Sequence, residues 1–143
     1  MTHDLKRVYF ILLLPAVAGF IALFALQYFH LIAWNTPDLP YLFTPFVFII
    51  SVCFAVAFPL LYRTVFANKM RHHTHTAEKD WLKFERKLLY IAMTTPYVSL
   101  IAQILRLPRF HLGAVIIMAL YAVYYYYPSR KRLEYEKRIF RVK

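Results

Sequence analysis

The chain has 143 residues, of which 61% are hydrophobic and 19% are aromatic, and its formal net charge at pH 7 is +11. Only 17% of the residues are charged, whereas an ordinary soluble domain has about 25%. A core of this size cannot hide so much apolar surface from water, so the composition excludes a soluble globular enzyme. The single cysteine, Cys53, excludes a disulfide scaffold. We therefore expect an integral membrane protein.

Four uncharged apolar runs predict four transmembrane helices, at residues 8–29, 41–62, 88–105 and 110–127. About 20 apolar residues are needed to cross about 30 Å of hydrocarbon, and the fourth run is the shortest of the four. None of the runs alternates with a period of two residues, which disfavours membrane strands. The sequence thus predicts an all-α fold, an integral membrane four-helix bundle in one domain (1–143). A basic loop (63–87) and a basic tail (128–143) complete it.

The positive charges are distributed unevenly along the chain. Of the 18 Lys and Arg residues, only Arg106 and Arg109 fall outside the N-terminus, the loop and the tail. The positive-inside rule then places both termini in the cytoplasm, and we expect a multi-pass protein of a bacterial inner membrane. Anionic lipid headgroups are the expected partners of the basic segments, at about 1 kcal/mol per Lys or Arg. No nucleic-acid-binding motif accompanies these charges, so nucleic acid is not expected as a partner.

Small residues predict how the helices pack, because helices in lipid associate through close contact. The predicted contact faces are listed by span: Ala18, Ala22 and Ala25 in the first, Ser51 and Ala55 in the second, Ala92, Thr95, Ser99 and Ala102 in the third, and Ala119 and Ala122 in the fourth. Pro15, Pro45, Pro59 and Pro96 are expected to kink or loosen their helices.

Two cytoplasmic segments have an amphipathic helical pattern. Residues 77–89 place Trp81, Phe84 and Leu88 on one face, and residues 129–142 place Tyr135, Ile139 and Val142 on one stripe. Both segments could lie at the headgroups or bind a partner, and residues 77–89 could also extend the third span into the cytoplasm. The expected partner or lipid surface consists of Trp81, Lys83, Arg86, Lys87, Arg130, Lys131, Arg132 and Arg138.

Two histidine groups are candidate ligand sites. On the outer side, His30 and His111 could face each other beside Arg106 and Arg109, and such a group could hold haem, a quinone carbonyl or an anionic headgroup. We favour ordinary interfacial placement, because membrane haem ligands normally lie inside the bundle. In the cytoplasmic loop, His72, His73 and His75 could bind zinc, copper or nickel or sense pH. A solvated loop is the favoured interpretation there.

The spans contain no Asp, Glu, Lys or Arg well inside them, which disfavours an ion-coupled transporter. No hydrolase, phosphate-loop or zinc-protease motif occurs, so an enzyme is not favoured and no catalytic residue is predicted. The leading hypothesis is a non-catalytic subunit or accessory factor of a larger membrane assembly, as a homo- or hetero-oligomer. One alternative is a haem-, quinone- or lipid-binding module that uses the outer His/Arg group. Another is an oligomeric pore or small-solute transporter.

Overall fold

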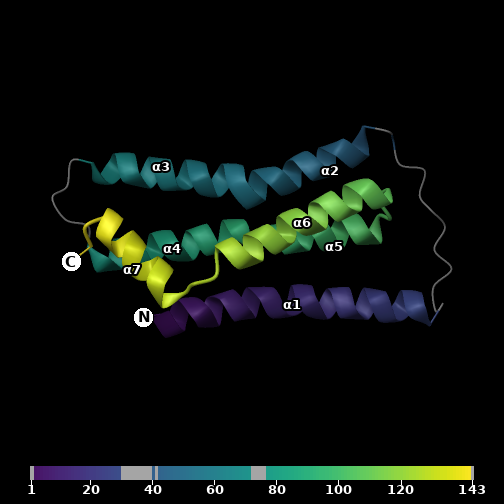
Figure 1. The fold of residues 1–143 in the computed structure, drawn as a ribbon, viewed down its shortest axis with the longest axis horizontal. Helices are drawn as coiled ribbons and strands as arrows, with labels where there is room; N and C mark the ends of the chain where they lie inside the picture. The colour runs from purple at the N-terminus through teal and green to yellow at the C-terminus, as the bar shows by residue number, and fades with distance from the viewer. Residues whose placement is uncertain (1, 30–39, 41, 72–76, 143) are drawn as a thin grey trace.

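The computed structural model describes residues 2–29, 40, 42–71 and 77–142, and every regular element in these residues is helical. The elements are α1 (Thr2–Tyr28), α2 (Phe43–Val52), the π-helical turn η1 (Cys53–Ala57), α3 (Phe58–Met70), α4 (Glu78–Ala92), α5 (Thr94–Ile104), α6 (Arg109–Tyr125) and α7 (Arg130–Ile139). The long helices lie side by side along one axis, and both ends of the chain lie at the same end of the molecule (Figure 1). The all-α prediction is confirmed.

We call the end that carries the start of α1, the end of α3, the start of α4 and all of α7 the basic end, and the opposite end the distal end (Figure 1). The chain runs from the basic end to the distal end in α1, returns through α2, η1 and α3, goes out again through α4 and α5, and returns in α6. The order of helices is therefore up, down, up, down, with α7 added across the basic end.

Two of the described helices are long and apolar enough to cross a membrane, at Asp4–Tyr28 and Phe43–Met70. A third candidate arises only if α6 and α7, which are bent by 76° at their junction, are counted together. The predicted third span is divided at Met93, which separates α4 from α5. The break has a local cause, because the nitrogen of Pro96 has no hydrogen to donate to the carbonyl of Ala92. The predicted fourth span corresponds to α6, which has only 17 residues.

The predicted loop at 63–87 is mostly helical. α3 continues the second apolar helix to Met70, eight residues beyond the predicted end of the span, and α4 begins at Glu78. The apolar face predicted for residues 77–89 is inward-facing, because Trp81, Phe84 and Leu88 are all buried. Residues 78–89, the first part of α4, therefore extend the third apolar run as a helix toward the basic end.

The helix formed by α2, η1 and α3 widens in the turn before Pro59. The Pro59 nitrogen cannot donate to the Ala55 carbonyl, and the backbone N–H of Phe58 donates to the carbonyl of Cys53, five residues earlier. By contrast, Pro15 lies within the unbroken α1. The predicted loosening therefore occurs before Pro59 but does not interrupt the helix at Pro15.

The core is largest at the basic end. Phe84, only 1% exposed, stacks on Phe66 and Tyr62 with ring centroids 4.1 and 5.3 Å apart. Phe140, from the last residues of the chain, meets Phe84 at 5.6 Å. Helices α3, α4 and α7 therefore share one aromatic core.

The predicted small-residue faces are buried in three of the four apolar segments that the sequence predicted as spans. Ser51, Ala55, Ala92, Thr95, Ser99, Ala102, Ala119 and Ala122 are all buried. In α1 the prediction is wrong, because Ala18 and Ala22 are exposed and Ala16 is buried instead. Two tyrosine hydroxyls fix the rotation of α1: Tyr9 donates to the Val123 carbonyl at 2.9 Å and Tyr97 donates to the Leu12 carbonyl at 2.6 Å.

Candidate functional site

The C-terminal helix α7 folds back across the basic end and packs on α4. The Ser129 hydroxyl accepts a hydrogen bond from the backbone N–H of Arg132 at 3.2 Å and so caps the start of α7. The buried face of α7 and the residue after it consists of Leu133, Glu136 and Phe140. Of the predicted stripe, Tyr135 and Ile139 are exposed, whereas Val142 is partly buried against the core.

A cluster of charged side chains around two buried acids, which we call the carboxyl cluster, joins α7 to α4 and α3. It consists of Arg63, Glu85, Arg132 and Glu136. Arg132 contacts both acids, with its Nη2 3.3 Å from Glu85 Oε2 and its Nε 3.3 Å from Glu136 Oε1. Arg63 reaches Glu136 Oε1 at 3.8 Å. Glu85 is 1% exposed and Glu136 is 4% exposed, whereas the side chains of Arg63 and Arg132 are 32 and 16% exposed, so the two acids are buried and the arginines are partly exposed.

The two carboxyl groups of this cluster share a proton. Glu85 Oε1 and Glu136 Oε2 are buried and have no donor among the other described groups. Both side chains contact the guanidinium of Arg132, and protonation of one carboxyl removes the repulsion between two buried negative charges. Such a shared proton is the expected state of two acids held together away from water.

The proton resides on Glu85. Burial, the hydrogen bond to Glu136 and the negative charge of Glu136 raise the pKa of Glu85 to about 9, although Arg132 and Arg63 act to lower it. Burial also acts to raise the pKa of Glu136, but the hydrogen bond from Glu85 and the charges of Arg132 and Arg63 outweigh it and lower that pKa. Near neutral pH the cluster therefore contains two guanidinium groups, one carboxylate and one neutral carboxylic acid.

The arrangement makes the docking of α7 specific in position. A buried charge without its partner costs several kcal/mol, so α7 cannot rotate or slide without exposing this network or leaving it unpaired. The guanidinium of Arg132 also lies 5.5 Å from the ring centroid of Tyr126, near the start of the connection to α7. The cluster thus fixes one register of α7 on α4.

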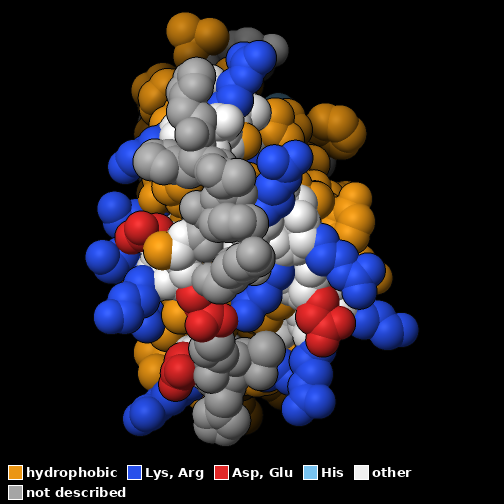
Figure 2. Space-filling view, turned by 90° about the vertical axis from the view of Figure 1, so that its left-hand side faces the viewer, with side chains coloured by type: hydrophobic (Ala, Val, Ile, Leu, Met, Phe, Trp, Pro, Cys, Tyr) orange, Lys and Arg blue, Asp and Glu red, His pale blue; other side chains and the backbone are white. Residues whose placement is uncertain are grey.

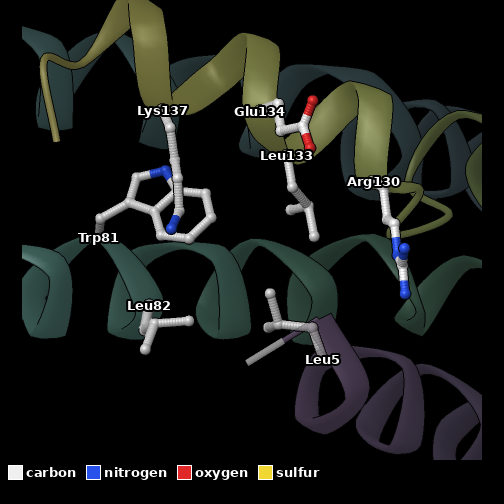
Figure 3. Close-up of a pocket in the computed structure, with 7 residues that line it drawn as sticks. All are labelled: Leu5, Trp81, Leu82, Arg130, Leu133, Glu134 and Lys137. Carbon is white, nitrogen blue, oxygen red and sulfur yellow. The ribbon is translucent and has the colours of Figure 1, made fainter.

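A second contact lies along the same helix (Figure 3). Lys137 lies over the ring of Trp81 at 5.1 Å and pairs with Glu78 at 2.8 Å. A hollow of about 310 Å³ beside it is lined by residues from α1, α4 and α7, including Leu5, Leu82, Arg130 and Leu133. The close-up shows α7 above α4, with the start of α1 beside the hollow.

The residues predicted as a partner or lipid surface divide into two groups. Lys83, Arg86, Lys87, Arg130, Lys131 and Arg138 are exposed, and Lys and Arg side chains surround the visible face of the basic end in Figure 2. Trp81 is buried, at 1% exposure. The Arg132 side chain is 16% exposed and belongs to the carboxyl cluster. These two residues therefore position α7 instead of facing a partner.

The outer His/Arg group is only partly within the described residues. His30 lies outside the described residues, and its predicted approach to His111 stays a prediction. Arg109 is exposed at the start of α6, and Arg106 precedes it with a left-handed backbone (φ 50°). His111 is partly buried, and its Nδ1 has no hydrogen-bond partner among the described groups. His72, His73 and His75 also lie outside the described residues.

Sequence reasoning missed the carboxyl cluster, although a signal was present. Glu85 is four residues after Trp81 and lies on the buried face of its helix, and Glu136 lies between Leu133 and Phe140 at three- and four-residue spacing. An acid within an apolar stripe is rarely solvent-facing and requires a partner. No known family model, curated protein or solved structure matches this chain.

Proposed function

We propose that this chain is a four-span membrane protein, with both termini in the cytoplasm of a bacterial inner membrane, that acts as a non-catalytic subunit or accessory factor of a larger assembly. The observation that carries the proposal is that α7 is held in one position by buried contacts. Its inner face is anchored through Arg132 and Glu136, while Arg130, Lys131 and Arg138 are exposed. A helix held in one register presents its outer charges in a fixed pattern, which lowers the entropic cost of binding a partner.

The proposed four-span topology combines the two long apolar helices with two shorter units. The end of α4 and α5 would form the third span and α6 the fourth, and these run in opposite directions (Figure 1). The 17 residues of α6 rise about 25 Å, which is short for about 30 Å of hydrocarbon. Local thinning of the bilayer accommodates a mismatch of this size at modest cost.

The exposed side of α1 supports association within the membrane. Phe10, Leu14, Ile21 and Phe24 are between 48 and 67% exposed along this helix. Lipid tails or apolar helices of other subunits are the surroundings that such side chains prefer. A partner could therefore contact both the apolar side of α1 and the basic side of α7.

The test is purification from the native membrane in mild detergent, followed by native mass spectrometry. We expect foreign membrane subunits in fixed stoichiometry, and we expect Lys131→Glu with Arg138→Glu to release them. Arg109→Glu, at the distal end, is the charge-reversal control and should retain them. Emission from the buried Trp81 reports whether α7 stays docked in each variant. A complex that contains only this chain and lipid, or equal release by both variants, would refute the proposal.

A second candidate function, a lipophilic-ligand module, is favoured by one observation. A hollow of about 350 Å³ opens between α1, α5 and α6, lined largely by apolar side chains such as Ala16, Phe20 and Leu120 with Gln103 as a polar group. Its size lies within the range of ligand sites, which is about 300–1,000 Å³. This candidate predicts a quinone or other isoprenoid that copurifies and is lost in Ala16→Phe. A preparation from quinone-producing cells that contains none would eliminate it.

A further inference from the structure

Two hollows adjoin along the outside of α3 and α4, and together we call them the α3–α4 groove. The first, of about 440 Å³, is lined by Lys69, Lys83, Lys87 and Asp80 together with apolar side chains. The second, of about 470 Å³, is lined by Phe54, Phe58, Leu61 and Ile91. Tyr62 and Val65 line both hollows, so the two are continuous.

Both walls of the groove change from apolar to cationic in the same direction. On α3, Phe58, Tyr62, Val65 and Lys69 follow one face at three- and four-residue spacing. On α4, which runs the opposite way, Lys83, Lys87 and Ile91 are four residues apart on one face. The cationic part of each wall therefore lies toward the basic end.

The depth of this change matches the edge of a membrane. From Phe43 to Tyr62 the helix rises about 30 Å, which is the thickness of the hydrocarbon layer. Lys69 then lies about 10 Å beyond Tyr62, and Lys87 immediately precedes the third apolar run. The three lysines thus fall at the level of the headgroups, and the aromatic and aliphatic part of the groove falls at the level of the acyl chains.

The charge of the polar part suits an anion. Lys69, Lys83 and Lys87 are exposed, and no ion pair among the described residues engages them. Asp80 is the acidic residue at this hollow, which leaves an excess of two positive charges. The stacked rings of Phe66, Phe84 and Tyr62 line the same hollow.

We propose that the α3–α4 groove binds one anionic phospholipid from the leaflet at the basic end. Its phosphate would lie among Lys69, Lys83 and Lys87, and an acyl chain would follow Phe58, Leu61 and Ile91 toward the membrane interior. The inference rests on the membrane placement proposed above and is independent of any protein partner. It distinguishes one built site from the general attraction of a basic surface for anionic lipid.

The experiment is titration of the delipidated full-length protein with phosphatidylglycerol and with phosphatidylcholine of the same acyl chains, followed by native mass spectrometry. Phosphatidylglycerol should bind as one preferred copy. Replacement of Lys69, Lys83 and Lys87 by Gln should weaken it about fivefold per lysine, or roughly a hundredfold in total. The triple control Lys79→Gln, Arg86→Gln and Lys131→Gln removes the same charge from exposed residues outside the groove, and should leave the preferred copy in place.

The apolar part of the groove has its own test. Ile91→Trp fills the acyl-chain hollow and should weaken both lipids, while soluble glycerophosphoglycerol, which has the headgroup without chains, should not displace the bound lipid. Equal loss in the two triple variants, no preference in the native protein, or displacement by the soluble headgroup would overturn the inference. The result of the partner-release experiment does not affect the lipid affinities measured here. Failure to bind either phospholipid would overturn the membrane placement as well.

Discussion

Glu85→Gln is the substitution that tests the shared proton most directly. The amide of glutamine can donate a hydrogen bond to the Glu136 carboxylate, as the protonated acid does in the native protein, and its oxygen can accept from Arg132. The variant therefore reproduces the form of the carboxyl cluster in which Glu85 is protonated, and position 85 no longer titrates. Because the side chain keeps its size, no cavity is created in the core.

The sign of the effect follows from the raised pKa. Glu85 has an ordinary pKa of 4.5 and one of about 9 in the folded protein, so the folded state holds a proton that the unfolded state releases between these values. Its stabilising contribution is complete below pH 4.5 and is lost as the pH rises through about 9. The lowered pKa of Glu136 acts only in acid, where its contribution is lost as the pH falls. Between pH 6 and 8, the free energy of unfolding therefore falls by about 1 kcal/mol per pH unit, or about 2–3 kcal/mol in total.

The assay follows the docking of α7 through the emission of Trp81, which is buried beneath Lys137. Replacing Trp34 by Phe leaves Trp81 as the single tryptophan, since the chain has two. Urea titrations at pH 6, 7 and 8 then give the unfolding free energy of the basic end in the native background and in Glu85→Gln. The stability of the variant relative to the native background should increase by about 2–3 kcal/mol from pH 6 to 8.

The control is Glu134→Gln, which removes an exposed carboxyl from the same helix and should leave the native pH dependence unchanged. A native protein whose stability is constant or rises from pH 6 to 8 would contradict the assignment of the proton. Glu85→Gln with the same slope as the native protein would show that the titration belongs to another group.

Four further substitutions test the packing. Phe84→Ala should reduce the free energy of unfolding by about 3–5 kcal/mol, because its ring is buried against Phe66, Tyr62 and Phe140; a loss below about 1 kcal/mol would contradict this core. Tyr97→Phe should cost about 1 kcal/mol by removing the hydrogen bond to Leu12, and an unchanged thermal midpoint would argue against that contact. Gly113→Ala should stabilise α6 by about 0.5–1 kcal/mol, since its new methyl meets nothing within 4 Å. Gly19→Ala should gain less, because its methyl would lie 3.0 Å from Leu100, and equal gains would refute the distinction.

Much of the helical framework follows from local sequence. Long uncharged runs predict α1 and the helix formed by α2, η1 and α3, and the three- and four-residue spacing of Trp81, Phe84 and Leu88 predicts the buried face of α4. The break near Pro96 and the widening before Pro59 also have local causes, since proline removes a backbone donor wherever it stands. The sequence pattern predicted the helix at residues 77–89 but did not reveal that α3 extends to Met70, because charged residues are as compatible with a helix as with a loop.

The tertiary structure decided which faces meet. Helical periodicity specifies which residues share a face, but not which neighbour that face contacts, so the exposed Ala18 and the buried Ala16 could not be distinguished from the sequence. The same reason accounts for α7, because its Arg132 and Glu136 resemble solvent-facing residues until Arg63 and Glu85 are brought to them from α3 and α4. Glu85 and Glu136 are 51 positions apart in the printed sequence, and only the folding of α7 onto α4 makes them one titrating pair. The sequence by itself determined the helices and the uneven distribution of positive charge, whereas the fold alone determined where two acids share a proton.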